Sequence, residues 1–125
     1  MTPKIKKVKI LASDQPGPRK VIVATTLHPI QDFPGQEQRI FEIEKLIDQA
    51  ADQAEQMYPG EELDLIVLPE EILTGGDPNR SPAEKALKID GPEMKRIRDK
   101  ARQYRTYIVV PLALAENDPD EAIYN

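Results

Sequence analysis

A run of four apolar residues at positions 65–68, Leu-Ile-Val-Leu, constrains the fold of this 125-residue chain more than any other feature. A continuous apolar run is typical of a strand covered on both faces, whereas a strand with one wet face alternates. The run stops at Pro69, which cannot donate to a β-ladder and therefore fits a strand end. Because helix-like stretches lie on either side, we predict a central strand of an α/β sheet.

Two acids, Glu70 and Glu71, follow Pro69 directly. Ligands of open α/β sheets gather beyond the carboxyl ends of the strands, so an acid here is a functional candidate. If both residues stay extended, their side chains point to opposite faces and do not form a proton-sharing pair or a glycosidase pair. The competing interpretation is a solvated acid at a strand end, since acids are rarely buried.

The composition argues against several classes of protein. The net charge of −5 lacks the basic bias of a nucleic-acid surface, and no apolar stretch is long enough to span a bilayer. The N-terminus carries lysines but no long apolar segment, so we expect no signal peptide and a cytoplasmic location. There is no cysteine among the 125 residues, which removes disulfides, thiolate metal sites and a cysteine nucleophile within them.

The first half of the chain pairs a strand with a long helix. Residues 21–26 are rich in β-branched side chains and predict a strand. Residues 36–57 predict an amphipathic helix, because apolar residues recur at three- and four-residue spacing. Its predicted inner stripe consists of Ile40, Ile43, Ile47, Ala50, Ala54 and Met57, widened by Phe41, Leu46 and Ala51. We interpret the acidic residues between them as a solvated face and not as a site.

The second half repeats the alternation of helix and strand. Ser81, Pro82 and Glu84 carry the signature of a helix start, so we predict a short helix that ends near residue 90. A second helix is predicted over residues 93–104 and a third strand over residues 107–114. The predicted inner stripe of the second helix consists of Met94, Ile97, Ala101 and Tyr104, and its outer face is basic.

These elements define an α/β fold. Residues 122–125 begin a returning strand, which gives the order β-α-β-α-α-β-β and ends in a hairpin. Strands separated by helices imply parallel strands with right-handed crossovers. We assign residues 20–125 to one domain and residues 1–19 to an N-terminal extension or edge strand.

Other polar residues are weaker candidates for a site. His28 follows the first strand in a loop, where a surface role is more common than a functional one. Asp64, Asp77 and Glu116 carry the carboxylates that magnesium prefers, but their spacing matches no metal motif, so we expect no metal. The basic helix has no interleaved aromatic residues, so we expect no nucleic-acid partner.

Four segments, taken in order, resemble the carbon–nitrogen hydrolase, or nitrilase, superfamily. The first is the strand at 20–26 with the Pro-Gly loop and long helix that follow. The second is Asp-Leu-Ile-Val-Leu-Pro-Glu at 64–70, and the third is the Asp-Gly-Pro helix start at 90–92. The fourth is the strand at 107–112, followed by Glu116 and by Tyr-Asn at 124–125. Their order and spacing together are more specific than any one of them.

The resemblance implies a four-layer α-β-β-α sandwich and a Glu-Lys-Cys triad that hydrolyses non-peptide C–N bonds. The implied substrate is a small-molecule amide or nitrile, with no cofactor, no membrane association and a homo-oligomeric enzyme. Glu70 matches the catalytic glutamate, and the role it implies is general base. Glu116 and Asn125 match positions that shape a hairpin near the pocket.

One departure from the family pattern changes the expectation. The family's lysine and cysteine follow the Tyr-Asn hairpin, whereas this sequence ends at Asn125 and has no cysteine. We therefore expect the N-terminal part of such an enzyme, truncated and inactive as this chain, with an apolar sheet face left uncovered. The alternatives are a stand-alone α/β binding module and a scaffold subunit whose partner chain supplies the lysine and the cysteine.

Overall fold

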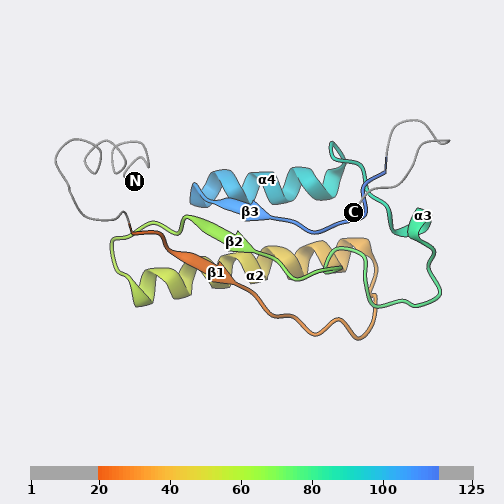
Figure 1. Cartoon of the computed structure of the whole chain (residues 1–125), viewed down its shortest axis with the longest axis horizontal. Helices are drawn as coiled ribbons and strands as arrows, with labels where there is room; N and C mark the ends of the chain where they lie inside the picture. The colour runs from red at the N-terminus through yellow and green to blue at the C-terminus, as the bar shows by residue number, and fades with distance from the viewer. Residues whose placement is uncertain (1–19, 116–125) are drawn as a thin grey trace.

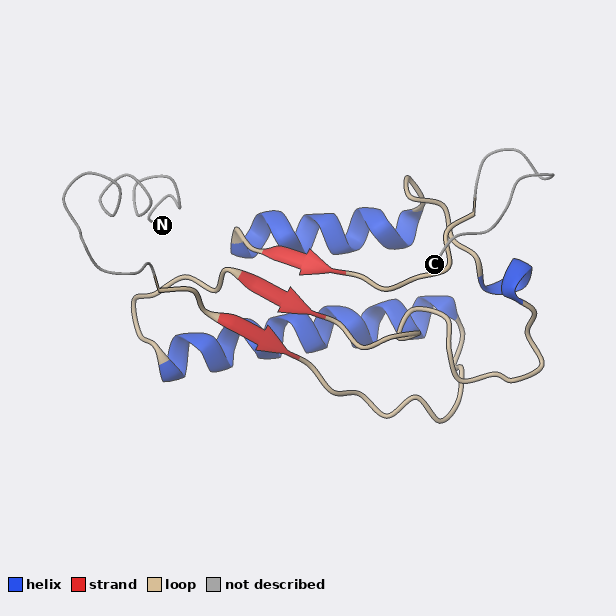
Figure 2. Cartoon of the chain, in the orientation of Figure 1, coloured by secondary structure: helices blue, strands red, loops and turns tan. Residues whose placement is uncertain are grey.

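Three short parallel strands form one sheet in the computed structural model, which describes residues 20–115. They are β1 (Val23–Thr25), β2 (Leu65–Val67) and β3 (Tyr107–Val109), in the order β1-β2-β3. All three arrows point the same way in Figure 2. The prediction that residues 65–68 supply the central strand of a parallel sheet is therefore confirmed.

The helices α2 (Gln36–Met57) and α4 (Pro92–Tyr104) provide the second layer. Figure 1 shows α2 beside β1 and β2, and α4 beside β3. Ala24, Ile66 and Ile108 lie in register on the sheet face that packs into the core with both helices. Ile66 is fully buried, as are several isoleucines of α2. Right-handed parallel crossovers account for this arrangement, because each crossover returns its helix to the same face.

Within residues 20–115, the opposite face of the sheet is partly exposed. Val23 and Val109 are about half exposed, at 50% and 46%, and Tyr107 is 76% exposed. The prediction that β2 is covered on both faces is wrong within residues 20–115, where helices pack on one face only. Within the same residues, the expected exposed apolar sheet face is present at Val23 and Val109.

Helix α2 has the predicted bounds, and five of the six predicted inner residues are buried. The exception is Met57, which is 68% exposed because it lies in the last turn, beyond the end of the sheet layer. Phe41 is also exposed rather than part of a widened stripe. Arg39, which the sequence analysis did not assign to the core, is 1% exposed.

Two elements are shorter than predicted. The helix expected to reach residue 90 is a single turn, α3 (Pro82–Lys85), and the predicted Ser81–Glu84 capping box is present. It stops because Leu87 exchanges backbone hydrogen bonds with Ala113 and Ala115, which a helix would forbid. The strand expected over 107–114 ends at Val109, since its neighbour β2 turns away at Pro69.

The sequence analysis interpreted the acidic face of α2 as solvated, but three of its acids form ion pairs with α4. Arg96 of α4 pairs with Glu37 and Glu44, and Lys100 of α4 pairs with Asp48 over 2.7 Å. These ion pairs join the exposed rims of the two helices. They also engage part of the basic face of α4.

The predicted returning strand at 122–125 and the N-terminal segment 1–19 lie outside the described residues. The full β-α-β-α-α-β-β order therefore stays a prediction, as do the proposed domain limits. No helix within residues 20–115 is both long and apolar enough to cross a membrane.

Candidate active site at the carboxyl edge of the sheet

Glu70 and Glu71 lie in a turn that begins where β2 ends. The turn is closed by two backbone hydrogen bonds, from Ile72 N–H to Pro69 O at 3.3 Å and from Gly75 N–H to Glu71 O at 2.7 Å. Glu71 has a φ of 59°, in the left-handed region. Both acids are exposed. The condition of an extended chain, on which the opposite-faces prediction rested, is therefore not met.

Helix α2 holds this turn from the core side. Arg39 donates hydrogen bonds from Nη1 to Ile72 O at 2.7 Å and to Gly75 O at 3.0 Å. Gln36, one turn earlier, donates from Nε2 to Leu73 O at 3.0 Å. The carbonyl groups of Ile72, Leu73 and Gly75 thus accept hydrogen bonds from the helix, while the two acids remain on the solvent side.

The loop between β1 and α2 is tied to the same turn. Arg39 Nη2 donates to Asp32 O at 2.5 Å, so one guanidinium group joins two loops. Gly76 has a φ of 109°, and a Cβ at this position would lie 2.1 Å from Asp32 O. Only glycine fits there, because both the backbone angle and the space exclude a side chain.

His28 lies on the same loop, at the carboxyl end of β1. Its Nε2 is 3.6 Å from Glu42 Oε1, and the same carboxylate oxygen is 3.4 Å from Arg39 Nε. The imidazole is 24% exposed. The predicted surface histidine is therefore only partly solvated, and its acidic neighbour also contacts the buried arginine.

The loop at 74–80 closes the far side of this region. The Arg80 guanidinium lies over the Phe33 ring, 4.2 Å from its centroid, and Arg39 approaches the same ring at 5.6 Å. Arg80 Nη1 also donates to Thr74 O over 3.4 Å. A cationic group over an aromatic face is attractive, so these contacts hold the two loops together.

Asp64 and Asp77, the two candidate metal ligands within residues 20–115, lie at opposite edges of the sheet. Asp64 precedes β2, at the amino edge of the sheet, where its Oδ2 accepts a hydrogen bond from Ile22 N–H at 3.0 Å. Asp77 lies beyond the opposite edge and caps its own turn by accepting from Asn79 N–H. Across residues 20–115, no three His, Cys, Asp or Glu side chains form a group that could hold a metal ion. The role of Asp64 is structural, because it joins β1 to β2.

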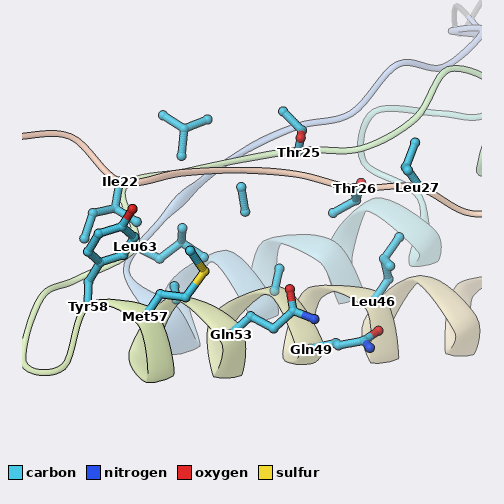
Figure 3. A pocket seen from close by; sticks show the side chains of 14 residues that line it. Ile22, Thr25, Thr26, Leu27, Leu46, Gln49, Gln53, Met57, Tyr58 and Leu63 are labelled. Carbon is cyan, nitrogen blue, oxygen red and sulfur yellow. The ribbon is translucent and has the colours of Figure 1, made fainter.

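A groove of about 440 Å³ lies elsewhere, between β1 and the second half of α2. In Figure 3, Gln49, Gln53 and Met57 line its helix side, and Ile22 and Thr26 line its strand side. The groove contains no side chain from the loops at 28–33 and 74–80, which lie near the turn of Glu70. Glu70 does not line it either, so the groove is separate from the candidate active site.

Glu116 and Asn125, the predicted hairpin residues, lie outside the described residues. Arg39 is the site residue that the sequence analysis missed. A signal for it existed: Arg39 precedes Ile43 and Ile47 at four-residue spacing, so it continues the apolar stripe of α2. A charged residue in a buried stripe marks a polar contact in the core, because an unpaired charge there is costly.

Comparison with known families identifies the chain. A family model described as carbon-nitrogen hydrolase matches residues 30–125, more than three quarters of the sequence. The chain belongs to the carbon–nitrogen hydrolase family. Comparison with curated proteins returned no match. The matched region of this carbon–nitrogen hydrolase chain includes Glu70, its turn and both α2 residues that hold the turn.

Proposed function

We propose that this chain supplies the general base, Glu70, of a hydrolase that cleaves a non-peptide C–N bond in a small amide or nitrile. The supporting observation is the position of Glu70 in a chain of the carbon–nitrogen hydrolase family. It is the first residue after Pro69, at the carboxyl end of the central strand, on a turn held by α2. Ligands of α/β sheets bind at this edge.

The proposed chemistry is covalent catalysis by a cysteine. Glu70 takes the thiol proton, the thiolate attacks the carbonyl carbon of an amide, and the amine leaves with a proton returned by Glu70. Glu70 then takes a proton from water, and the resulting attack on the thioester releases the carboxylic acid and restores the thiol. A lysine stabilises the negative oxygen of the tetrahedral intermediate. Glu71 has no part in these steps.

The nucleophile has to come from polypeptide other than residues 1–125, because these contain no cysteine. We propose that the same polypeptide adds the second sheet of an α-β-β-α sandwich and covers the exposed face at Val23, Tyr107 and Val109. Such a layer also encloses the site, which suits a carboxylate base because removal from water raises the pKa of an acid toward neutrality. A homo-oligomeric, cytoplasmic enzyme without a cofactor belongs to the same proposal.

The experiment uses the native gene product that contains residues 1–125. It is assayed for ammonia or amine release from a panel of small amides and nitriles. Glu70→Gln should lower kcat by about 10²–10⁴-fold, the usual contribution of a general base. Glu71→Gln is the matched control, since it changes the same charge one residue away, and should leave kcat within about twofold of wild type. Equal losses in both variants, or none in Glu70→Gln, would refute the assignment.

A second measurement distinguishes the two possible sources of the cysteine, a longer single chain and a partner chain. Residues 1–125 alone should release no ammonia from any of these substrates. A coding sequence that continues past Asn125 to a lysine and a cysteine supports a longer single chain, whereas co-purification of a cysteine-containing partner supports a scaffold subunit. Turnover by residues 1–125 alone would contradict the cysteine mechanism.

A further inference from the structure

Arg39 is a buried charge that the proposed mechanism does not use. Its side chain is 1% exposed, in the second turn of α2. A buried charge is costly unless hydrogen bonds and an opposite charge compensate it. Compensation comes from three backbone carbonyl groups and from Glu42, whose carboxylate lies 3.4 Å from Arg39 Nε. The positions of these three carbonyl groups indicate the structural role of Arg39.

The three acceptors belong to two loops at the carboxyl edge of the sheet. Ile72 O and Gly75 O are in the turn that carries Glu70, and Asp32 O is in the loop between β1 and α2. A guanidinium group suits this set, because its planar fork presents several donors in fixed directions. Lysine has one nitrogen at the end of a flexible stem and cannot reproduce that fork.

We propose that Arg39 is the positioning residue for Glu70, an inference that rests on the proposed function. Arg39 binds the turn at Ile72 and Gly75 and leaves the segment with Glu70 on the open side. The hydrogen bond from Ile72 N–H to Pro69 O encloses the two acids, and the one from Gly75 N–H to Glu71 O joins Glu71 to a residue that Arg39 binds. Fixing residues 72 and 75 therefore fixes the direction in which Glu70 leaves the sheet.

Two further contacts support the same role. Gln36 donates to Leu73 O between the two carbonyls that Arg39 binds, so the turn has three attachments to α2, at residues 72, 73 and 75. Gly76 lies so close to Asp32 that no side chain fits between them. The two loops therefore share one polar anchor, and without the guanidinium the buried carbonyls of Ile72 and Gly75 would lose these hydrogen bonds.

The first test measures the turn itself, by NMR on the full 125-residue chain. The variants are Arg39→Met, which keeps length but removes every donor, and Arg39→Lys. The control is Ile47→Ala, a core truncation two turns further along α2. In Arg39→Met, the order parameter of the Glu70 amide should fall from about 0.85 to below about 0.6, the values of rigid and flexible backbone. Ile47→Ala should leave it near the wild-type value.

Hydrogen exchange gives the matching local readout. The Gly75 amide should exchange at least about tenfold faster in Arg39→Met than in wild type, relative to the Leu68 amide of the same chain, and Arg39→Lys should be intermediate. If Arg39→Met does not fold, the same ratio of Gly75 to Leu68 exchange rates is measured in Arg39→Lys and Gln36→Ala. The proposal is overturned if the ratio is unchanged in these variants, or if Ile47→Ala changes it equally.

Enzyme assays of the native gene product test the effect of Arg39 on catalysis. Arg39→Lys should lower kcat at least about tenfold with KM within about twofold, because a misplaced base slows chemistry and leaves binding intact. Ile47→Ala should leave kcat per folded molecule unchanged. A loss confined to KM would overturn the positioning role. If Glu70→Gln itself retains full activity, the proposed function fails, while the NMR results still report separately whether Arg39 holds the turn.

Discussion

The hydroxyl group of Tyr104 donates a hydrogen bond to Asp48 Oδ1 over 2.5 Å and so joins α4 to α2. Lys100 donates to the same oxygen at 2.7 Å. Burial raises the pKa of Tyr104, and the hydrogen bond to Asp48 adds to this, which brings it to about 12. In Asp48, burial acts to raise the pKa, but the hydrogen bonds from Lys100 and Tyr104 outweigh it and lower the pKa.

We predict an alkaline phase of unfolding that depends on Tyr104. The folded-state pKa of about 12 lies above the unfolded value of about 10, so this group stabilises the fold below pH 10. That contribution is lost as the pH rises from 10 through 12. Phenolate absorbance during an alkaline titration should show a late-titrating tyrosine that is missing in Tyr104→Phe. A Tyr104→Phe titration curve identical to wild type would contradict the prediction.

Asp48, the acidic partner in the same contact, predicts the opposite dependence of stability on pH. Because the folded-state pKa of Asp48 is lowered, its contribution is present above the unfolded pKa of about 4 and is lost as the pH falls through the lower folded value. Asp48→Asn should therefore melt below wild type at neutral pH, and the two melting temperatures should converge in strong acid. Asp52→Asn, one turn further on, is the control and should lower the melting temperature less than Asp48→Asn at neutral pH, because the hydrogen bonds from Lys100 and Tyr104 go to Asp48.

The two faces of the sheet differ in burial, so substitutions on them should change the free energy of unfolding by different amounts. Ile66 is fully buried beneath the helices, so Ile66→Ala should lower the free energy of unfolding by about 2–5 kcal/mol. Val109→Thr, on the uncovered face, should change it by no more than about 0.5 kcal/mol. Urea denaturation measures both values. Similar losses would show that both faces are buried in solution.

Gly76 and Gly60 form a matched pair for testing the contact between the loops. Both have positive φ, at 109° and 81°, but only at Gly76 would a Cβ meet another segment, at 2.1 Å from Asp32 O. Gly60→Ala should cost about 1–2 kcal/mol through backbone strain. Gly76→Ala should cost more, because the clash is with backbone that cannot rotate away. Thermal melts of the two variants decide the point, and equal costs would exclude a close contact at Gly76.

The uncovered sheet face predicts association of the 125-residue chain. Val23, Val109 and Tyr107 expose neighbouring apolar surface on one face, and such patches drive contacts between proteins. Light scattering should show an apparent mass that rises with concentration. The double variant Val23→Thr and Val109→Thr should reduce that rise. A wild-type chain that stays monomeric at every concentration would show that the patch is too small to associate.

The sequence alone determined the local elements and their order as far as β3. Apolar residues at three- and four-residue spacing defined α2 to its exact bounds, and the run before Pro69 defined the central strand. The same segment placed Glu70 and Glu71 at a strand end, and its resemblance to the family motif pointed to Glu70 as the candidate base. These features are readable because helix periodicity, strand composition and proline are properties of neighbours along the chain.

Only the tertiary structure decided how these elements constrain the site. Arg39 binds carbonyl groups 33 and 36 residues further along the chain, and no local pattern specifies such partners. The same holds for the turn that keeps Glu70 and Glu71 from being extended, and for the acids of α2 that pair with α4. Short-range periodicity reports which side of an element is buried, whereas the contacts that position Glu70 depend on where the crossovers bring distant backbone together.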